Sequence, residues 1–238
     1  MPPKKSNVDV WIKRETPHRQ KALENASRHF DDDDALSVHI LEGIYGQESS
    51  FGIKLGKRNS AGAAGDFQLE KKTAIRMGLT VSEKNDQRFD VDDASAASAK
   101  DLKTLDESFE KKTNLGGGIE TAPVSNPRER LIFNLAAFNA GEGRIARAQQ
   151  LAETDGKNPE KWEDVQKFLR QAGASAAKIK EIVEYVKKVL SHASEFAKKS
   201  KADKNIKNKE PAAILGFPKG GHWITKDGKH ILIKGPKQ

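Results

Sequence analysis

Hydrophobic residues recur at intervals of three and four along most of the chain, which is the spacing of helices that bury one face. In the clearest early stretch the apolar positions are Leu36, Ile40, Leu41 and Ile44. By the same criterion, the pattern predicts helices over about residues 35–45, 91–110, 127–140, 160–171 and 175–199. The segment 11–30 is a weaker helix candidate, because Pro17 interrupts it. The chain is therefore predicted to be mainly α-helical.

The ends of the helix predicted over 35–45 hold residues with candidate chemistry. Four aspartates at 31–34 precede it, and we expect one to cap the helix while the others favour the positive end of its dipole. Gly43 and Gly46 predict a tight exit into a loop that holds Glu48. Apolar neighbours there would desolvate the Glu48 carboxyl group and raise its pKa, so that it stays protonated near neutral pH. Glu48 is thus a candidate general acid, although most glutamates at helix ends are solvated surface groups.

The C-terminal part of the chain differs in composition from the rest. Six lysines fall between residues 198 and 209, with almost no apolar residues, which predicts a linker or a solvated helix extension. Further on, β-rich runs at 221–225 and 229–233 flank Asp227-Gly228, a strong signal for a β-hairpin. Two histidines in these runs are interpreted as cross-strand packing residues, because no further metal ligands accompany them. No metal and no cofactor is predicted.

Composition limits the classes of partner. The 238 residues are 36% hydrophobic and 32% charged, with a formal net charge of +8, which favours a polyanionic partner such as nucleic acid, an acidic membrane surface or a cell-wall polymer. There is no cysteine, so disulfides and Cys-based zinc sites are excluded. No run of about 18 apolar residues occurs, so no membrane span is predicted. The basic N-terminus lacks a following apolar segment, so we expect no Sec-type signal peptide.

Four short motifs follow one another along the chain. They are Glu48-Ser49, Gly62-Ala63-Ala64-Gly65-Asp66-Phe67-Gln68 with Thr73-Ala74, Ala136-Ala137-Phe138-Asn139-Ala140-Gly141-Glu142-Gly143-Arg144-Ile145, and a weaker match at 181–190. Together, and in this order, they resemble the motifs of the soluble lytic transglycosylase family of goose-type lysozyme-like enzymes. The resemblance covers roughly residues 35–195. Asp66 and Phe67 stand where that family usually has Leu-Met, and Phe138 stands where it commonly has Tyr.

The resemblance implies a goose-type lysozyme-like helical domain with a small C-terminal β-hairpin appendage. The expected segments are an N-terminal, partly helical stretch (1–30), a catalytic domain (31–197), a Lys-rich linker (198–212) and a hairpin tail (213–238). It further implies that Glu48 is the single catalytic acid and base. The residues implied to bind substrate are Ser49, Phe67, Gln68, Phe138, Asn139 and Tyr185. The implied reaction cleaves the β-1,4 bond between N-acetylmuramic acid and N-acetylglucosamine in peptidoglycan and leaves a 1,6-anhydro product.

Three other interpretations stay open. The same fold could act as a hydrolase, a lysozyme or muramidase, if Asp66 or Glu142 activates water as a second carboxylate. The chain could be a wall-binding virion component without turnover, although Glu48, Gln68 and Asn139 all being present argues mildly against this. Nucleic-acid binding through the lysine-rich stretch is disfavoured. It predicts salt-sensitive DNA binding that survives loss of the first 190 residues.

The implied substrate lies in the bacterial cell wall, in the periplasm or outside the cell. The absence of a Sec signal and the form of the tail favour a phage or prophage origin, with delivery by a virion and an assembly partner at the hairpin. The predicted partner in catalysis is the glycan strand of peptidoglycan.

Overall fold

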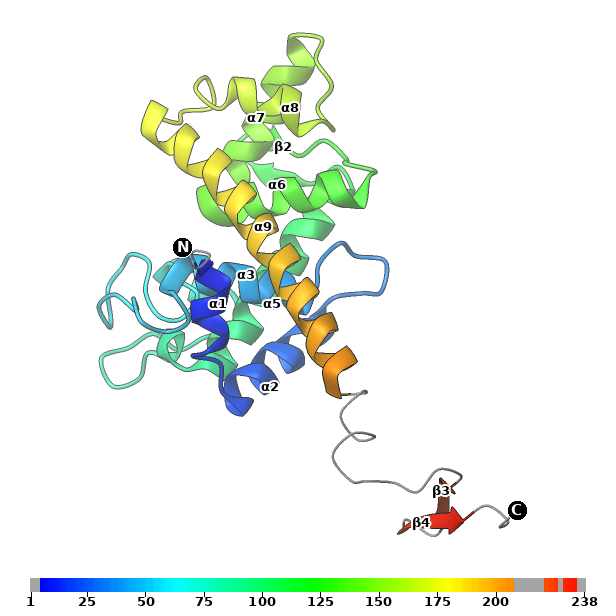
Figure 1. The fold of residues 1–238 in the computed structure, drawn as a ribbon. Coiled ribbons are helices and arrows are strands. Elements are labelled where there is room, and N and C mark those ends of the chain that lie inside the picture. The colour runs from blue at the N-terminus through cyan, green and yellow to red at the C-terminus, as the bar shows by residue number, and fades with distance from the viewer. Residues whose placement is uncertain (1–4, 208–220, 227–228, 235–238) are drawn as a thin grey trace. The chain divides into compact units, whose positions relative to one another are not determined.

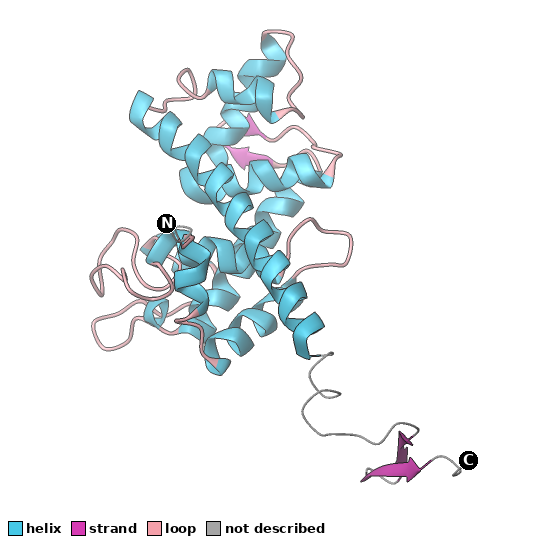
Figure 2. Cartoon of the chain, in the orientation of Figure 1, coloured by secondary structure: helices cyan, strands magenta, loops and turns pink. Residues whose placement is uncertain are grey.

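The computed structural model describes residues 5–207, 221–226 and 229–234. The chain divides into two compact units, Met1–Phe196 and Ala197–Gln238. The described part is mainly helical, as predicted, with small antiparallel strand pairs (Figures 1 and 2). The longer elements are α1 (Asn7–Ile12), α2 (Pro17–Ala26), α3 (Val38–Ser49), α4 (Lys71–Arg76), α5 (Val91–Glu110), α6 (Pro127–Ala140), α7 (Glu142–Thr154), α8 (Trp162–Val165) and α9 (Ala176–Lys207). Single 3-10 turns are η1 (Ser27–His29), η2 (Gln87–Phe89) and η3 (Gln166–Phe168).

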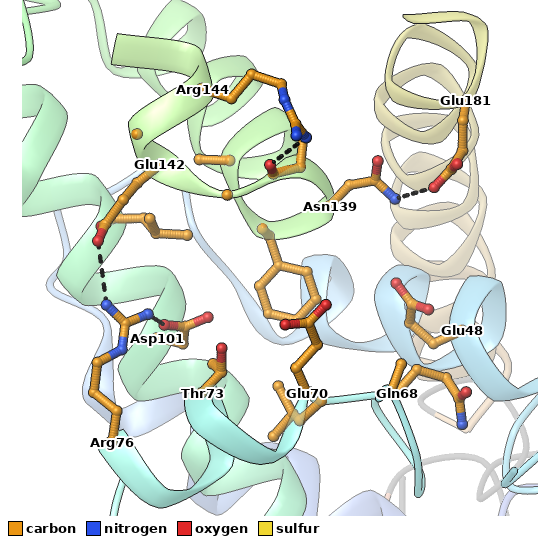
Figure 3. A pocket seen from close by; sticks show the side chains of 18 of the residues that line it. Glu48, Gln68, Glu70, Thr73, Arg76, Asp101, Asn139, Glu142, Arg144 and Glu181 are labelled. Carbon is orange, nitrogen blue, oxygen red and sulfur yellow. Dashed lines mark hydrogen bonds and ion pairs between the residues drawn. The ribbon is translucent and has the colours of Figure 1, made fainter. Parts of the chain in front are cut away.

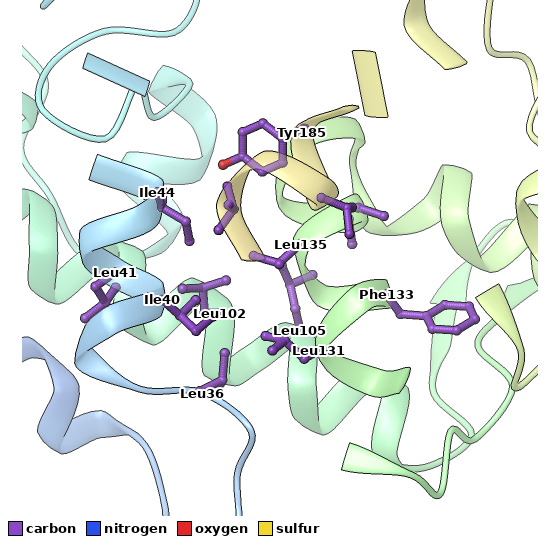
Figure 4. Close-up of a cluster of buried hydrophobic side chains, with 14 of the residues drawn as sticks. Leu36, Ile40, Leu41, Ile44, Leu102, Leu105, Leu131, Phe133, Leu135 and Tyr185 are labelled. Carbon is purple, nitrogen blue, oxygen red and sulfur yellow. The ribbon is translucent and has the colours of Figure 1, made fainter. Parts of the chain in front are cut away.

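The core of the first unit surrounds α5, which packs against α2 on one side and α6 on the other. Leucine and isoleucine side chains from α3, α5 and α6 meet there and are almost fully buried (Figure 4). They include Leu41, Ile44, Leu102, Leu105, Leu131 and Leu135. Burial of each such side chain contributes roughly 1.5–3 kcal/mol. These contacts fix α3, whose last turn carries Glu48, relative to the end of α6.

Helix α3 differs from its prediction at both ends. It begins at Val38, and the aspartates at 31–34 do not cap it, since its first flanking residue is Ser37. Asp31 and Asp34 instead bind the ammonium group of Lys103 on α5, at 2.6 and 2.9 Å. Because that partner is about 70 residues away in sequence, local pattern alone favoured the cap.

The other end of α3 lies beyond the glycines that were expected to stop the helix. Gly46 is inside α3, where a Cβ atom would lie 2.4 Å from ring atoms of Trp11. Gly43 likewise lies close to α9, since a Cβ there would be 2.9 Å from the carbonyl oxygen of Val189. Both glycines therefore serve close packing, and the helix continues until Ser50 adopts a left-handed conformation, with φ of 55°. Glu48 consequently lies on a helix and not in a loop.

Other predicted elements are found with shifted bounds. Pro17 begins α2 and does not interrupt a longer helix, because Thr16 caps the backbone N–H of Arg19. The helix predicted over 160–171 is reduced to α8 and η3. The segment between α5 and α6 contains the short antiparallel pair β1 (Asn114–Gly116) and β2 (Ile119–Glu120).

The C-terminal lysine-rich stretch is helical as far as Lys207, since α9 continues to that residue. In the second unit, β3 (Gly221–Lys226) pairs antiparallel with β4 (Lys229–Lys234), as the hairpin signal predicted. Lys226 lies opposite Lys229, and the predicted Asp227-Gly228 turn falls outside the described residues. His222 is paired with Ile233 and His230 with Thr225, so the two histidines are not cross-strand partners.

Candidate active site

Glu48 lines a groove of about 650 Å³ in the first unit (Figure 3). The groove walls come from the end of α3, the segment leading into α4, the middle of α5, the junction of α6 and α7, and the start of α9. Among the residues predicted for the site, Gln68, Phe138 and Asn139 line the groove with Glu48. Ser49, Phe67 and Tyr185 are not among the lining residues, and each is buried. Segments distant in sequence thus converge around one carboxyl group.

The Glu48 carboxyl group is held in an environment that favours its protonated form. Burial raises its pKa from the ordinary value of 4.5 to about 7, and the negative charge of Glu181 acts in the same direction. The hydroxyl of Tyr185 and the ammonium of Lys178 oppose the rise. The Tyr185 hydroxyl is buried, and its approach to Glu48 falls outside ordinary hydrogen-bond geometry. A carboxyl group with a pKa near 7 can both give and take a proton at neutral pH.

Ser49 was implied to bind substrate, but its hydroxyl forms hydrogen bonds to the backbone at the end of α3. The Ser49 Oγ donates to the carbonyl oxygen of Tyr45 at 3.2 Å and accepts from the backbone N–H of Gly52 at 2.9 Å. These bonds satisfy backbone groups at the end of α3, where helical hydrogen bonding stops. Ser49 therefore fixes the backbone on which Glu48 is carried, without a contact to the carboxyl group itself.

Gln68 is positioned by its own backbone surroundings. Its φ is +47°, and its Nε2 donates to the carbonyl oxygens of Gly65 at 2.7 Å and Lys54 at 3.1 Å. With its nitrogen engaged in this way, the amide has one fixed orientation at the groove edge. Its side-chain oxygen is the group left to accept a hydrogen bond from a ligand.

Phe67 was implied to bind substrate, but it does not line the groove. Its side chain is fully buried and stacks on Tyr45 with ring centroids 5.2 Å apart. The adjacent Asp66 is also buried, next to Tyr45 and Arg19, and is not part of the groove lining. This part of the loop therefore packs into the core, and Gln68, the next residue, lines the groove.

Asn139 lies on the last turn of α6 and reaches toward α9. Its Nδ2 donates to Glu181 Oε1 at 3.1 Å, and Lys178 Nζ donates to the same oxygen at 2.8 Å. Lys178 also donates to the backbone carbonyl of Asn139 at 3.0 Å. The Asn139 Oδ1 is buried without a hydrogen-bond partner among the described residues. The pKa of Glu181 is lowered, chiefly by the Lys178 hydrogen bond, so Glu181 is a carboxylate at neutral pH.

A second group of charged side chains in the groove was not found from the sequence. Arg76, at the end of α4, donates to Asp101 at 2.9 Å and to Glu142 at 3.2 Å. Asp101 is buried on α5, whereas Glu142 is half-buried at the start of α7. Figure 3 places this trio on the opposite side of the groove from Glu48. Only Glu142 was considered in the sequence, because it belongs to a motif.

The fold and the site define a lysozyme-like helical domain, with an acidic side chain at a helix end that faces a groove. The family model described as Transglycosylase SLT domain matches residues 28–161, more than half of the chain, and the chain belongs to this family. The fourth sequence motif, at 181–190, lies outside the matched segment.

Individual proteins similar to this chain are named as lytic transglycosylases. The chain is 30% identical over 155 residues to the membrane-bound lytic murein transglycosylase F of Pseudomonas fluorescens, a match that covers 64% of this chain and 28% of the relative. It is 29% identical over 144 residues to the protein of that name from Desulfosudis oleivorans, covering 57% of this chain and 28% of the relative. The chain thus spans little more than a quarter of these relatives. Within the described residues, no helix is both long and apolar enough to cross a membrane.

Proposed function

We propose that this chain is a peptidoglycan lytic transglycosylase, a lyase in which Glu48 serves as both acid and base. The proposal is carried by one observation: a half-buried carboxyl group with a pKa of about 7 lies in a groove with the amides of Gln68 and Asn139. Membership of the transglycosylase family supports the substrate class. A groove of about 650 Å³ is large enough to hold part of a glycan strand.

In the first step, protonated Glu48 gives its proton to the glycosidic oxygen between N-acetylmuramic acid and N-acetylglucosamine. The bond from C1 of the muramic acid to that oxygen breaks, and the N-acetylglucosamine leaves with a free hydroxyl group. The carbonyl oxygen of the substrate's own N-acetyl group meets the positive charge that develops at C1. Glu48 is left as a carboxylate, and no second protein carboxylate is needed at this stage.

In the second step, the Glu48 carboxylate takes the proton from the C6 hydroxyl of the same muramic acid. The C6 oxygen attacks C1 and closes the 1,6-anhydro ring, which restores protonated Glu48. Because nucleophile and electrophile belong to one sugar, the step gains from proximity and consumes no water. A carboxyl group with a pKa near neutral suits both transfers.

The neighbouring residues would position Glu48 and the sugar. Tyr185 acts on the carboxyl group from the core side, where its hydroxyl favours the charged form that follows the first step. Phe138 offers an apolar face in the groove, and Gln68 and Asn139 offer amides to the sugar substituents. Ser49 and Phe67 would act only through the backbone and the core behind the site.

Hydrolysis by the same fold is the nearest alternative, and it requires a second carboxylate to activate water. Of its two candidates, Asp66 lies behind the groove and is buried next to Tyr45. Glu142 does line the groove, but it is paired with Arg76 on the side away from Glu48. These placements favour the intramolecular attack by the C6 hydroxyl.

Digestion of purified peptidoglycan sacculi tests the proposal. Wild-type protein should release products with 1,6-anhydro ends, identified by mass spectrometry, whereas Glu48→Gln should release almost none. Glu120→Gln is a matched control, because Glu120 forms an exposed ion pair with Lys112 outside the groove lining. Reducing ends in place of anhydro ends would indicate hydrolysis. Equal release by wild type and Glu48→Gln would remove Glu48 as the catalyst. Binding of wild-type protein to sacculi without release of products would favour a wall-binding role.

The setting in which the chain acts is also a proposal. We expect it to act on the cell wall, with the hairpin β3–β4 as the surface for an assembly partner in a phage particle. Mass spectrometry of purified particles tests whether the chain is a virion component. Binding to DNA, the disfavoured alternative, should appear as salt-sensitive retention of the full chain on duplex DNA.

A further inference from the structure

The trio formed by Arg76, Asp101 and Glu142 joins three helices at one place in the groove. Arg76 comes from α4, Asp101 from α5 and Glu142 from α7. The arginine side chain is 47% exposed although both of its partners are fixed on helices. An arginine held by two carboxylates keeps its guanidinium plane in one orientation, and this one lies open to the groove. The trio is therefore a preorganised polar surface.

The trio has hydrogen-bonding capacity beyond its internal contacts. A guanidinium group carries five N–H donors. Among the described residues, Arg76 uses its Nη1 for Glu142 and its Nη2 for Asp101. Each carboxylate accepts a hydrogen bond from Arg76 through one of its two oxygens, which are Oε1 of Glu142 and Oδ1 of Asp101. Donors and acceptors thus stand side by side, which suits a group that both donates and accepts.

The charged side chains that line the groove indicate which class of ligand it can hold. Carboxyl groups outnumber basic side chains in the lining of the groove. The carboxyl groups are those of Glu48, Glu70, Asp101, Glu142 and Glu181, and the basic side chains are Arg76, Arg144 and Lys178. Arg144 is itself directed to the carbonyl oxygen of Ala140 at 2.8 Å. This balance disfavours an anionic ligand such as the carboxylate of a peptide stem. Hydroxyl groups are neutral, donate to carboxylates and accept from guanidinium N–H groups, so they match the surface.

We propose that Arg76, Asp101 and Glu142 form a distal subsite that holds a neutral sugar ring of the bound glycan through its hydroxyl groups. This inference rests on the proposed function, since it takes the glycan strand as the ligand of the groove. The subsite would hold a ring remote from the scissile bond, because Glu48 lies at the other side of the groove. Its contribution is affinity for longer strands and a defined register, without a part in bond cleavage.

The test is binding of stem-free glycan strands to the inactive Glu48→Gln protein, measured by calorimetry. Arg76→Lys is added to this background because it keeps the positive charge but loses the planar fork of donors. Strands long enough to reach the subsite should bind about tenfold more weakly to the double variant, the scale of one lost hydrogen bond to a charged group. Short strands that end before the subsite should bind equally to both. A second variant, Glu142→Gln, should show the same dependence on length while leaving the pair between Arg76 and Asp101 in place.

Other outcomes would overturn the inference. Equal loss for short and long strands, together with a lower melting temperature, would mean that the trio only supports the fold. No change for either length would mean that the trio does not touch glycan. Strands that carry peptide stems are measured in parallel, and a loss of affinity confined to them would assign the trio to the peptide. Because binding is measured without turnover, the result is separate from the proposed lyase activity, which fails only if the wild type yields no anhydro ends.

Discussion

The side-chain amide of Asn139 donates a 3.1 Å hydrogen bond to Glu181, and this bond ties the last turn of α6 to α9 beside Glu48. The same carboxylate oxygen accepts from Lys178 at 2.8 Å. Two opposite charges on α9 therefore lie near the proposed acid, and they act on its pKa in opposite directions. Because Glu181 receives both donors, it orients Asn139 and also adds negative charge next to Glu48.

The charge of Glu181 should be visible in the pH dependence of the reaction. The acid must be protonated, so wild-type kcat/KM should fall as pH rises through the Glu48 pKa of about 7. Glu181→Gln removes a negative charge, which should lower the Glu48 pKa and move this alkaline limb to lower pH. Lys178→Met removes a positive charge and should move the limb to higher pH. Shifts of both variants in the same direction would contradict this electrostatic account.

The Tyr185 hydroxyl should influence the pKa of Glu48 and have little effect on the stability of the fold. It opposes the rise in the Glu48 pKa, so Tyr185→Phe should raise that pKa and extend activity to higher pH. The hydroxyl is buried and has no partner in ordinary hydrogen-bond geometry among the described residues, so its removal should change the free energy of unfolding by less than about 1 kcal/mol. Urea unfolding and a pH–rate profile measure the two effects. A large loss of stability with an unchanged profile would assign Tyr185 a purely structural role.

Stability should fall as pH rises from about 4.5 to about 7, because two carboxyl groups have folded-state pKa values raised to about 7. For such groups, the unfolded chain loses its proton first, so fewer protons are bound in the unfolded state over this window and stability declines with pH. Glu48→Gln should flatten the decline. Glu15→Gln should flatten it as well, since Glu15 is raised by burial and by the charges of Glu42 and Glu24. Chemical unfolding at a series of pH values checks this, and an unchanged slope in both variants would refute it.

Gly46→Ala should destabilise the protein by about 1–3 kcal/mol, the usual effect of overpacking. The new methyl group would lie 2.4 Å from ring atoms of Trp11, which cannot move without disturbing its stacking on Phe51. Gly143→Ala is a matched control for stability, because none of the residues that the structure describes comes within 4 Å of a Cβ atom at that helical position. Thermal unfolding of the two variants should therefore diverge. Similar melting temperatures would mean that Trp11 adapts.

Local signals predicted the parts of the fold that local interactions determine. The helix over 127–140 was predicted with its observed bounds, since Asn126 caps it and Pro127 occupies its first position. The end of α3 was misplaced because Gly46 was interpreted as a terminator. Its role depends on Trp11, which is 35 positions earlier in the chain. No local pattern reports such a contact.

The candidate site, like the fold, was predicted only where its residues belong to local sequence motifs. Glu48, Gln68 and Asn139 fall in sequence motifs, and the structure brings them to one groove. Arg76 is 25 residues from Asp101 and 66 from Glu142, and the three residues lie on different helices, so no local spacing pattern links them. Only the packing of α4, α5 and α7 brings these charges together. Phe67 was implied to bind substrate but is buried outside the groove lining, because the sequence does not show which residues of an irregular segment point inward.

The packing of Trp11 against Gly46 also has a practical consequence for anyone who wants to transplant this domain into a chimera. Trp11 lies upstream of residue 28, where similarity to the family begins, and α9 lies downstream of residue 161, where it ends. Trp11 packs against α3 at Gly46 and α9 packs against it at Gly43, two and five residues before Glu48. A fragment that contains only residues 28–161 would lose Trp11 and α9, and with them two packing contacts of the helix that carries Glu48. A fragment for use in a chimera should therefore start at α1 and extend into α9.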